Sequence, residues 1–273
     1  MAEFLLYGDI DRLPADPRII EHIRRQNANK FEWYDDVNLI CFDWLDITDV
    51  SRATEKITIC QRKSQVYYIC ETPELLARLK EYAGQPSRPD KELFRFFTSL
   101  LHRDIDAMED MEERVTDMED VLLGDNRTDY TVGIIALRKE LLRLKRYYEG
   151  LSQVFDGILE NENGFIAEED IRFFKLLDQR VDRLLAHIVN LRDYITQVRE
   201  AYQAQIDIEQ NRLMKVFTVV TAIFLPLTLI AGWYGMNLQM PEFGWPYGYV
   251  FVIALCALVV GGMIFFFKRK KWF

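Results

Sequence analysis

The chain has 273 residues, of which 49% are hydrophobic and 28% charged, and its formal net charge is −9. This composition fits soluble domains and membrane proteins alike, so the distribution of residues along the chain has to decide between them. Residues 212–273 carry six basic side chains and one acidic side chain, a net charge of +5, which leaves −14 on residues 1–211. An acidic soluble part argues against nucleic acid as a partner and suits cations, because nucleic-acid binding needs a cationic surface.

Residues 1–89 are predicted to form a small cytosolic α/β domain. Runs rich in β-branched and aromatic residues predict strands near Asn38–Trp44, Lys56–Cys60 and Val66–Cys70. Thr72 as a cap and Pro73 at the first helical position predict a helix over 72–83. The Pro- and Gly-containing stretch 84–90 predicts a linker.

Residues 90–166 are predicted to form a two-helix cytosolic bundle. Helical periodicity extends over 91–123, and a second helix is expected from about 130 to 159. The stretches "GDNRTD" and "ENENG" end the two patterns. The window 104–120 contains nine acidic residues and one Arg, and it is interpreted either as a solvated face or as a face whose charge is compensated by bound divalent cations.

A third helix is expected from Glu168 onward, because no Gly or Pro occurs before Pro226. These 58 residues would span about 87 Å as one helix, so residues 167–215 are predicted to be the cytosolic part of a stalk helix. Apolar residues at alternating steps of four and three predict a coiled-coil-like seam against the two preceding helices. The seam comprises Leu177, Val181, Leu184, Ile188, Leu191, Ile195, Val198 and Tyr202.

Two uncharged segments, Val216–Tyr234 and Phe243–Phe267, predict a transmembrane hairpin. They contain 19 and 25 residues, and crossing a hydrocarbon core takes roughly 20 helical residues. The expected hairpin consists of a first transmembrane helix over 216–235, an extracellular loop over 236–246, a second helix over 247–267 and a basic tail over 268–273. The six basic residues flank the hairpin, so both chain ends are expected in the cytoplasm, and the N-terminus shows no signal-peptide pattern.

A polar stripe follows the third helix into the first uncharged segment. In the soluble part it comprises Asn190, Asp193, Gln197, Glu200, Ala204 and Asp207, and a solvated face is the simplest interpretation there. In the apolar part it continues through Asn211, Met214, Phe217 or Thr218, Thr221, Leu225, Thr228 and Gly232. Lipid offers no hydrogen bonds to Asn211 or Thr228, so this part must face other helices as packing or water as a pore lining.

The stretch "NRLMKVFTVVTAIFLPLTLIAGWYGMNLQMPE", residues 211–242, is followed by a second apolar span and the terminal "KRKKW". It resembles the CorA-type magnesium channels of the CorA/ZntB superfamily, whose signature is the Tyr-Gly-Met-Asn found here at 234–237. The resemblance is most specific over 211–242 and least specific over 1–90. It implies an α+β cytosolic domain, a long stalk helix and a C-terminal two-helix transmembrane hairpin, assembled as a funnel-shaped homopentamer in the cell membrane.

The resemblance also implies which residues carry the function. The expected pore lining is Asn211, Met214, Phe217, Thr221, Leu225, Thr228 and Gly232, with Phe217 preferred over Thr218. Gly235, Met236 and Asn237 correspond to the external selectivity ring, and Glu200 and Asp207 are candidate regulatory metal ligands. The implied activity is passive uptake of Mg²⁺, together with Co²⁺ or Ni²⁺, gated by cytosolic Mg²⁺.

Physical chemistry supports a neutral selectivity ring. Magnesium loses its water reluctantly, and conduction requires binding that is weak enough for release, so amide oxygens of Asn237 suit a hydrated ion better than carboxylates would. Gly235 is expected to end the helix with a positive φ, and Glu242 is expected to concentrate cations near the loop. Met214 and Phe217 predict an apolar constriction, with ordinary packing as the alternative.

Other classes of site have little support. Cys41, Cys60, Cys70 and Cys256 show no paired spacing, so we expect reduced, buried thiols. The three histidines lack zinc-site spacing, and no nucleophile, phosphate-loop or dinucleotide motif occurs, so we expect neither an enzyme nor a bound cofactor. The competing hypotheses are a zinc transporter of the same superfamily and a non-conducting oligomeric membrane scaffold.

Overall fold

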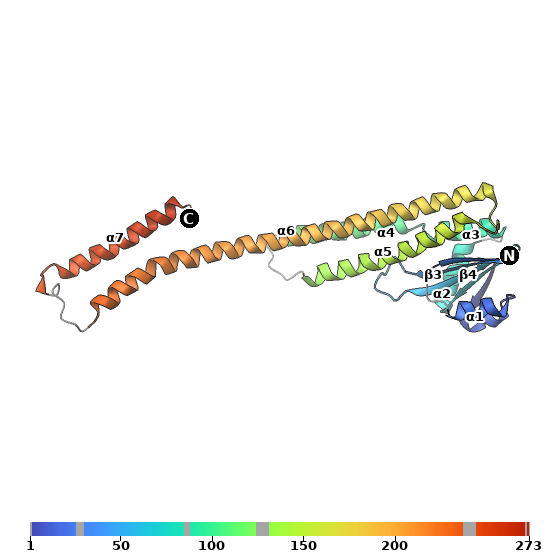
Figure 1. Cartoon of the computed structure of the whole chain (residues 1–273), viewed down its shortest axis with the longest axis horizontal. Coiled ribbons are helices and arrows are strands. Elements are labelled where there is room, and N and C mark those ends of the chain that lie inside the picture. The colour runs from blue at the N-terminus through green and yellow to red at the C-terminus, as the bar shows by residue number, and fades with distance from the viewer. Residues whose placement is uncertain are drawn as a thin grey trace. The chain divides into compact units, whose positions relative to one another are not determined.

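The computed structural model describes residues 2–25, 30–84, 88–123, 131–236, 244–270 and 272. The chain divides into two compact units, Met1–Arg199 and Glu200–Phe273. The first unit contains a sheet and several helices, and the second contains apolar helical segments. Helix α6 (Glu168–Tyr234) begins in the first unit and continues into the second (Figure 1).

A five-stranded sheet forms the centre of the first unit. Its strands are β1 (Ala2–Leu6), β2 (Lys30–Tyr34), β3 (Val37–Trp44), β4 (Glu55–Gln61) and β5 (Val66–Cys70), in the order β1-β5-β4-β3-β2. β1 is parallel to β5 and all other neighbours are antiparallel. The three strands predicted from β-branched and aromatic runs are confirmed as β3, β4 and β5, and β1 and β2 are added at the two edges.

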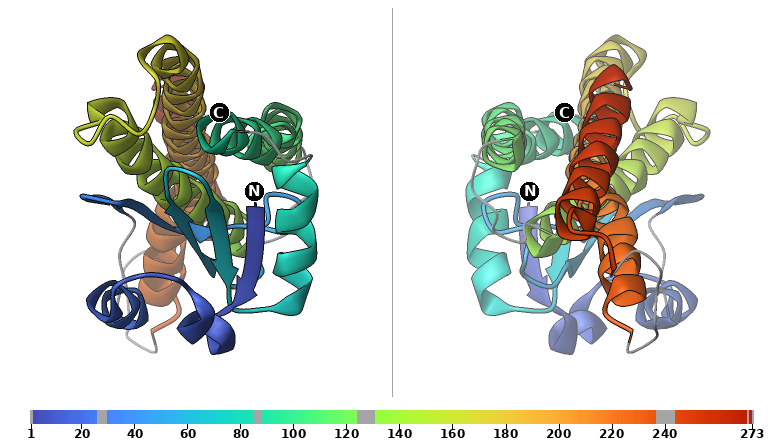
Figure 2. Two further views of the ribbon diagram at one scale, coloured as in Figure 1. Left: turned by 90° about the vertical axis from the view of Figure 1, so that its right-hand side faces the viewer. Right: turned by 90° about the vertical axis from the view of Figure 1, so that its left-hand side faces the viewer.

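Helices cover both faces of this sheet, so β3, β4 and β5 are almost entirely buried. On one face the 3₁₀ helix η1 (Tyr7–Arg12) and helix α1 (Pro17–Arg25) pack against alternate strand residues such as Leu39, Cys60 and Ile69 (Figure 2). On the other face Tyr68 contacts Phe96, at 5.0 Å between ring centroids. Of the four predicted buried thiols, Cys41, Cys60 and Cys70 are confirmed, whereas Cys256 is half-buried. Burial raises the pKa values of Cys41 and Cys60 to about 11 and about 12.

Helix α2 (Pro73–Ala83) follows the sheet, and the capping prediction for it is confirmed. The backbone N–H of Leu75 donates to the Thr72 hydroxyl at 3.2 Å, and Pro73 occupies the first turn. The residues predicted as one helix over 91–123 instead form two helices, α3 (Pro89–Leu100) and α4 (Asp104–Leu123). The break at Leu101–Arg103 has no Gly or Pro. It is held by Arg180 of α6, which donates to the Leu101 carbonyl at 2.7 Å.

Helices α4, α5 (Thr131–Glu160) and the N-terminal part of α6 form a bundle beside the sheet. Arg114 of α4 binds Glu140 of α5 at 2.8 Å, and Tyr194 of α6 donates to Glu119 of α4. The helix α5 backbone lies close to the sheet at Gly157, where an added Cβ would lie 2.4 Å from the Phe31 Cβ. The predicted break after α5 is confirmed, with Asn161 and Gly164 both at positive φ.

The apolar seam predicted along α6 is confirmed within the first unit. Seven of its eight residues, from Leu177 to Val198, are buried, and Tyr202 is half-buried. The polar stripe between them is exposed in the isolated chain, including Asn190, Asp193 and Gln197. This end of α6 therefore belongs to the core of the soluble unit.

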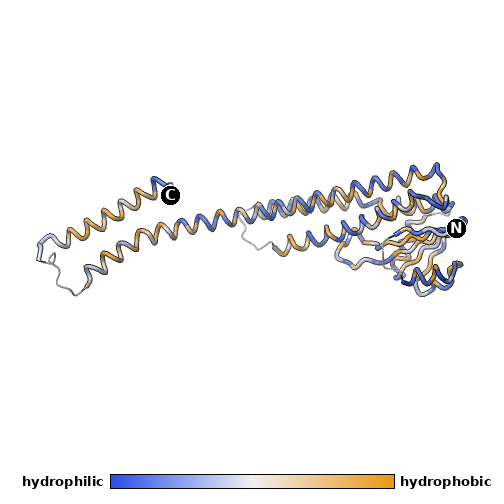
Figure 3. The backbone as a smooth tube through the Cα atoms, viewed as in Figure 1, coloured by the Kyte–Doolittle hydropathy of each residue, from blue (hydrophilic) through white to orange (hydrophobic). Residues whose placement is uncertain are grey.

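The second unit has a different character. It contains the C-terminal part of α6, which is uncharged from Val216 to Tyr234, and helix α7 (Gly248–Arg269), which is uncharged up to Phe267 (Figure 3). Among its described residues, Val219 and Phe267 are buried, and the rest are exposed or half-buried. A stretch of α6 and a stretch of α7 are each long and apolar enough to cross a membrane, and 6% of each is buried.

Candidate functional site on the apolar helices

The predicted pore residues lie at the expected helical spacing along the apolar part of α6, and all seven are exposed in the isolated chain. Met214, Phe217 and Leu225 expose 63%, 66% and 65% of their surface. Thr221, Leu225, Thr228 and Gly232 also line one shallow groove with Met236. The structure thus brings four of the seven residues onto a common concave face, and none of the residues that it describes covers that face.

The threonines of this region form hydrogen bonds within the helix. The Thr228 hydroxyl donates to the Phe224 carbonyl at 2.9 Å, and the Thr218 hydroxyl donates to the Met214 carbonyl at 2.7 Å. Such bonding satisfies each hydroxyl hydrogen without a second helix, which matters in a medium without water. The oxygen lone pairs remain free to accept hydrogen bonds from outside the helix. Thr228 therefore presents a neutral acceptor on the groove face.

The backbone conformation at Gly235, where α6 ends, differs from the prediction. Its backbone N–H donates to the Ala231 carbonyl at 2.9 Å, and Gly235 does not have the positive φ that was expected. An added Cβ would lie 2.9 Å from the same carbonyl oxygen, closer than real Cβ contacts allow. The need for glycine is therefore steric rather than conformational. Asn237 and Glu242 lie outside the described residues.

Aromatic and basic residues mark the ends of α7. Trp245 lies 6.3 Å from Tyr247 and 6.1 Å from Phe251, between ring centroids, at the start of the helix. Lys268 and Arg269 occupy its last turn. Aromatic side chains at one end and basic side chains at the other are typical of helices that cross a bilayer with the basic end in the cytoplasm.

The two candidate regulatory acids, Glu200 and Asp207, are exposed on α6. Gln203 donates to the Asp207 carboxylate at 3.2 Å. Among the residues that the structure describes, no group of three or more His, Cys, Asp or Glu side chains is placed to hold a metal ion. A single chain therefore does not bring Glu200 and Asp207 together with further acidic ligands.

An acidic first unit, a continuous helix α6 that ends in an uncovered apolar stretch, and a second uncovered apolar helix are the arrangement expected of an integral membrane protein. The family model of the CorA-like Mg²⁺ transporter protein matches residues 12–269. The chain therefore belongs to this family, whose members are membrane-integral metal-ion transporters or channels and not enzymes. The predicted family and the prediction that the chain is not an enzyme are confirmed on this ground.

Individual relatives differ in the ions they are named for. The cobalt/magnesium transport protein CorA of Thermotoga maritima is 26% identical over 186 residues, covering 68% of this chain and 53% of that protein. The match thus spans about half of the Thermotoga protein. The zinc transport protein ZntB of Pectobacterium carotovorum is 27% identical, covering 80% of this chain and 66% of that protein.

The fold also matches a solved structure. The CorA magnesium transporter of Methanocaldococcus jannaschii superposes with a TM-score of 0.80, covering 98% of this chain and 87% of that chain at 20% identity. This likeness confirms the predicted fold, an α+β domain followed by a long helix and a C-terminal apolar hairpin.

Proposed function

We propose that the protein is a passive channel for divalent cations, mainly Mg²⁺, formed by five copies of this chain around a water-filled axis. One observation supports this most directly: a single face of α6 carries Thr221, Thr228 and Gly232 among apolar residues and is uncovered in the isolated chain. Lipid offers no partner to the acceptor oxygens of such a face, so water or another helix suits it better. Copies of the same face around an axis would form the lining of a pore.

The chemistry of this face suits a hydrated ion. In the proposed pore, Asn211, Thr221 and Thr228 supply neutral oxygens. The five copies of Met214, of Phe217 and of Leu225 each form an apolar constriction around the axis, which closes the pore when water leaves it. The Gly235–Asn237 signature stands at the outer end, where Asn237 amides accept hydrogen bonds from the water shell of the ion. Neutral acceptors attract Mg²⁺ without the tight binding that a ring of carboxylates would produce. The membrane potential then drives the ion inward.

The proposed selectivity ring is tested by Mg²⁺ flux into liposomes that contain the purified protein. Asn237→Ala is expected to abolish flux while size-exclusion chromatography still shows the intact oligomer. Asn190→Ala is the matched control, because Asn190 is an exposed Asn of α6 in the soluble unit. Wild-type flux through Asn237→Ala would contradict the ring, and absence of flux in wild type would favour the non-conducting scaffold.

Zinc transport is the second candidate, because the Pectobacterium relative is named for zinc. Competition between Mg²⁺, Co²⁺, Ni²⁺ and Zn²⁺ in the same liposomes separates the two. Inhibition of Mg²⁺ flux by Co²⁺ or Ni²⁺, with little Zn²⁺ entry, is expected. Preferential Zn²⁺ entry would assign the chain to the zinc type.

We also propose that cytosolic Mg²⁺ closes the channel by bridging neighbouring copies through Glu200 and Asp207. Both side chains are exposed in the isolated chain, on the polar stripe that continues into the proposed pore face. An ion that binds the closed form better shifts the equilibrium toward it. Glu200→Gln with Asp207→Asn should weaken inhibition by internal Mg²⁺, whereas Asp117→Asn, an exposed acid of α4, should not. Unchanged inhibition in the double variant would contradict this site.

A further inference from the structure

Asp104 occupies an unusual position for an aspartate. It is the first residue of α4, directly after the break from α3, and it is fully buried. The Tyr148 hydroxyl of α5 donates to its Oδ2 at 2.8 Å. Its Oδ1 is buried without a hydrogen-bond partner among the described residues. A buried carboxylate with one oxygen unsatisfied is costly when ionised and much less so when protonated.

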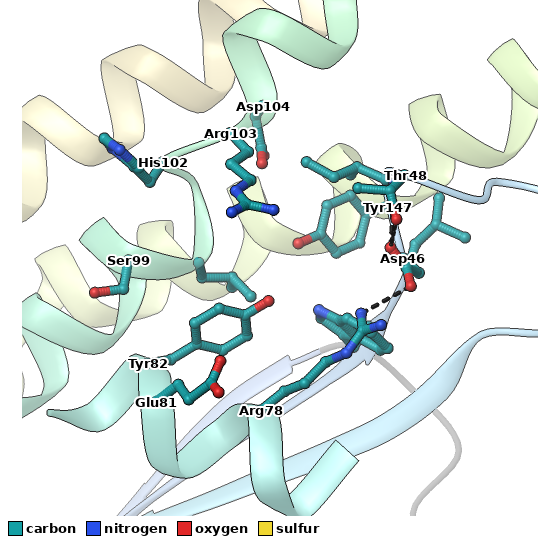
Figure 4. A pocket seen from close by; sticks show the side chains of 14 residues that line it. Asp46, Thr48, Arg78, Glu81, Tyr82, Ser99, His102, Arg103, Asp104 and Tyr147 are labelled. Atoms are coloured by element: carbon teal, nitrogen blue, oxygen red, sulfur yellow. Dashed lines mark hydrogen bonds and ion pairs between the residues drawn. The ribbon is translucent and has the colours of Figure 1, made fainter. Parts of the chain in front are cut away.

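Several polar groups surround Asp104 from each neighbouring element. Asp104 is one of the residues that line a cavity of about 360 Å³ (Figure 4). The facing groups are Tyr147 and Tyr148 of α5, Arg180 of α6, Tyr82, Glu81 and Arg78 of α2, Asp46 after β3, and Arg103 in the break. Burial raises the pKa of Asp104 to about 6, against the hydrogen bond from Tyr148 and the charge of Arg180, which both lower it.

Arg180 ties this junction to α6. Its guanidinium donates to the carbonyls of Leu101 at 2.7 Å and His102 at 3.5 Å, so α6 holds the end of α3 just before Asp104. The Arg180 Nε is itself buried without a partner among the described residues. Two unsatisfied groups therefore lie at one junction, one on α4 and one on α6.

A second acidic contact holds the first turn of α6. Asp170 of α6 and Asp90 of α3 both accept a hydrogen bond from Arg88, at 2.8 and 3.1 Å, and both are buried. Burial and then the neighbouring Asp90 raise the pKa of Asp170, against the charges of Arg88 and Lys91. Burial, followed by Asp182 and Asp156, likewise raises the pKa of Asp178.

We propose that Asp104, supported by Asp170, is a proton-binding latch that sets how firmly the N-terminal end of α6 is held to the sheet and bundle. Protonation neutralises Asp104 and relieves its unsatisfied charge, so the docked junction is more stable in acid. This contribution is fully present below the ordinary pKa of an aspartate and is lost as the pH rises through about 6. Helix α6 also carries the proposed pore face and the proposed Mg²⁺ ligands Glu200 and Asp207. Cytosolic pH would therefore act on the same helix as cytosolic Mg²⁺, a point that rests on the proposed function.

Amide hydrogen exchange in the full-length protein tests this latch between pH 5.0 and 7.5. Once the intrinsic pH dependence of exchange is divided out, protection of residues 168–182 should fall with a midpoint near pH 6. Because only about one pH unit of the tested range lies below the raised pKa of Asp104, about 6, the expected fall in protection is about tenfold. No ion flux is needed, so the result is independent of which ion the protein carries.

Asp104→Asn should flatten this pH dependence, because Asn has nearly the same shape and does not titrate. Asp106→Asn is the matched control, since Asp106 is an exposed acid two residues further along α4. The latch would be overturned if the wild-type protein showed equal protection at pH 5.0 and pH 7.5. It would also be overturned if Asp104→Asn kept the pH dependence of the wild-type protein. If Asp104→Asn does not fold, the infrared band of a protonated carboxyl is measured in the wild-type protein instead. Loss of this band as the pH rises through about 6 supports the latch, and absence of the band at pH 5 overturns it.

Discussion

The two ends of α6 show how one helix can serve two environments. Between Leu177 and Val198 its apolar residues are buried at steps of three and four, whereas between Asn211 and Gly232 a single residue, Val219, is buried. Both parts are regular helix, so secondary structure does not distinguish them. The difference lies in what covers the side chains. The first part is covered by its own chain, and we expect the second to be covered by lipid and by other copies.

The largest expected effect comes from two isoleucines of the same helix. Ile188 is completely buried, and Ile208 exposes 71% of its surface. Ile188→Ala should lower the free energy of unfolding by about 2–5 kcal/mol, because it leaves a cavity in the core. Ile208→Ala should change it by less than about 0.5 kcal/mol. Urea unfolding in detergent, followed by circular dichroism, measures both.

Measuring the oligomeric state makes the comparison of Ile188→Ala with Ile208→Ala more decisive. If neighbouring copies cover Ile208, Ile208→Ala should weaken the assembly on size-exclusion chromatography without lowering the stability of the chain. An equal loss of unfolding free energy in the two variants would show that the distinction between the two ends of α6 is wrong.

The space around two glycines, one in each unit, shows the same difference in packing. An added Cβ at Gly157 of α5 would lie 2.4 Å from the Phe31 Cβ, whereas at Gly261 of α7 it would meet nothing within 4 Å. Gly157→Ala should therefore cost about 1–3 kcal/mol through overpacking. Gly261→Ala should leave the unfolding of the soluble unit unchanged. A harmless Gly157→Ala would mean that α5 can move away from β2 without loss of packing.

The local signals predicted much of the soluble unit. Thr72 and Pro73 act within one turn of helix, and the breakers after α5 act within five residues, so α2 and the start of α6 were predicted correctly. The break between α3 and α4 was missed, because the side chain that binds it, Arg180, is 79 residues away in the sequence. The burial of Asp104 was missed for the same reason, since its partner Tyr148 is 44 residues distant.

The candidate site was predicted less completely than the soluble unit. Helical spacing placed Thr221, Leu225 and Thr228 on one face, and the structure brings them together in one groove. Spacing cannot say what lies opposite that face, because the partners that we propose for it are other copies of the chain. The local conformation at Gly235 was predicted wrongly, because a glycine at a helix end has two physical explanations that look alike in sequence.

Two threonines of α6 test what the groove face does. Thr196 and Thr228 each donate to the carbonyl four residues earlier, at 3.0 and 2.9 Å, one in each unit. Thr228→Val should reduce Mg²⁺ flux severalfold, equivalent to about 1 kcal/mol, because the pore loses a neutral acceptor. Thr196→Val should leave flux unchanged, and neither variant should alter unfolding by more than about 0.5 kcal/mol. Retained flux in Thr228→Val would place that hydroxyl away from the ion path.

Two glycines of the chain separate two physical reasons for the use of a glycine. Gly164 has a φ of +63° with nothing within 4 Å of an added Cβ, whereas Gly235 lacks a positive φ and would bring a Cβ to 2.9 Å from the Ala231 carbonyl. Asn tolerates positive φ better than Ala does, but its Cβ is the same. Gly164→Asn should therefore be milder than Gly164→Ala, which should cost about 1 kcal/mol in unfolding free energy.

At Gly235 the two substitutions should be equally harmful, each lowering Mg²⁺ flux by up to about tenfold, or about 1.4 kcal/mol. Gly244→Ala is the control at the other end of the loop, because an added Cβ there meets nothing within 4 Å. Flux recovered by Gly235→Asn but not by Gly235→Ala would restore the conformational explanation. The steric explanation requires both to fail alike, because any Cβ at that position meets the backbone oxygen that ends the helix.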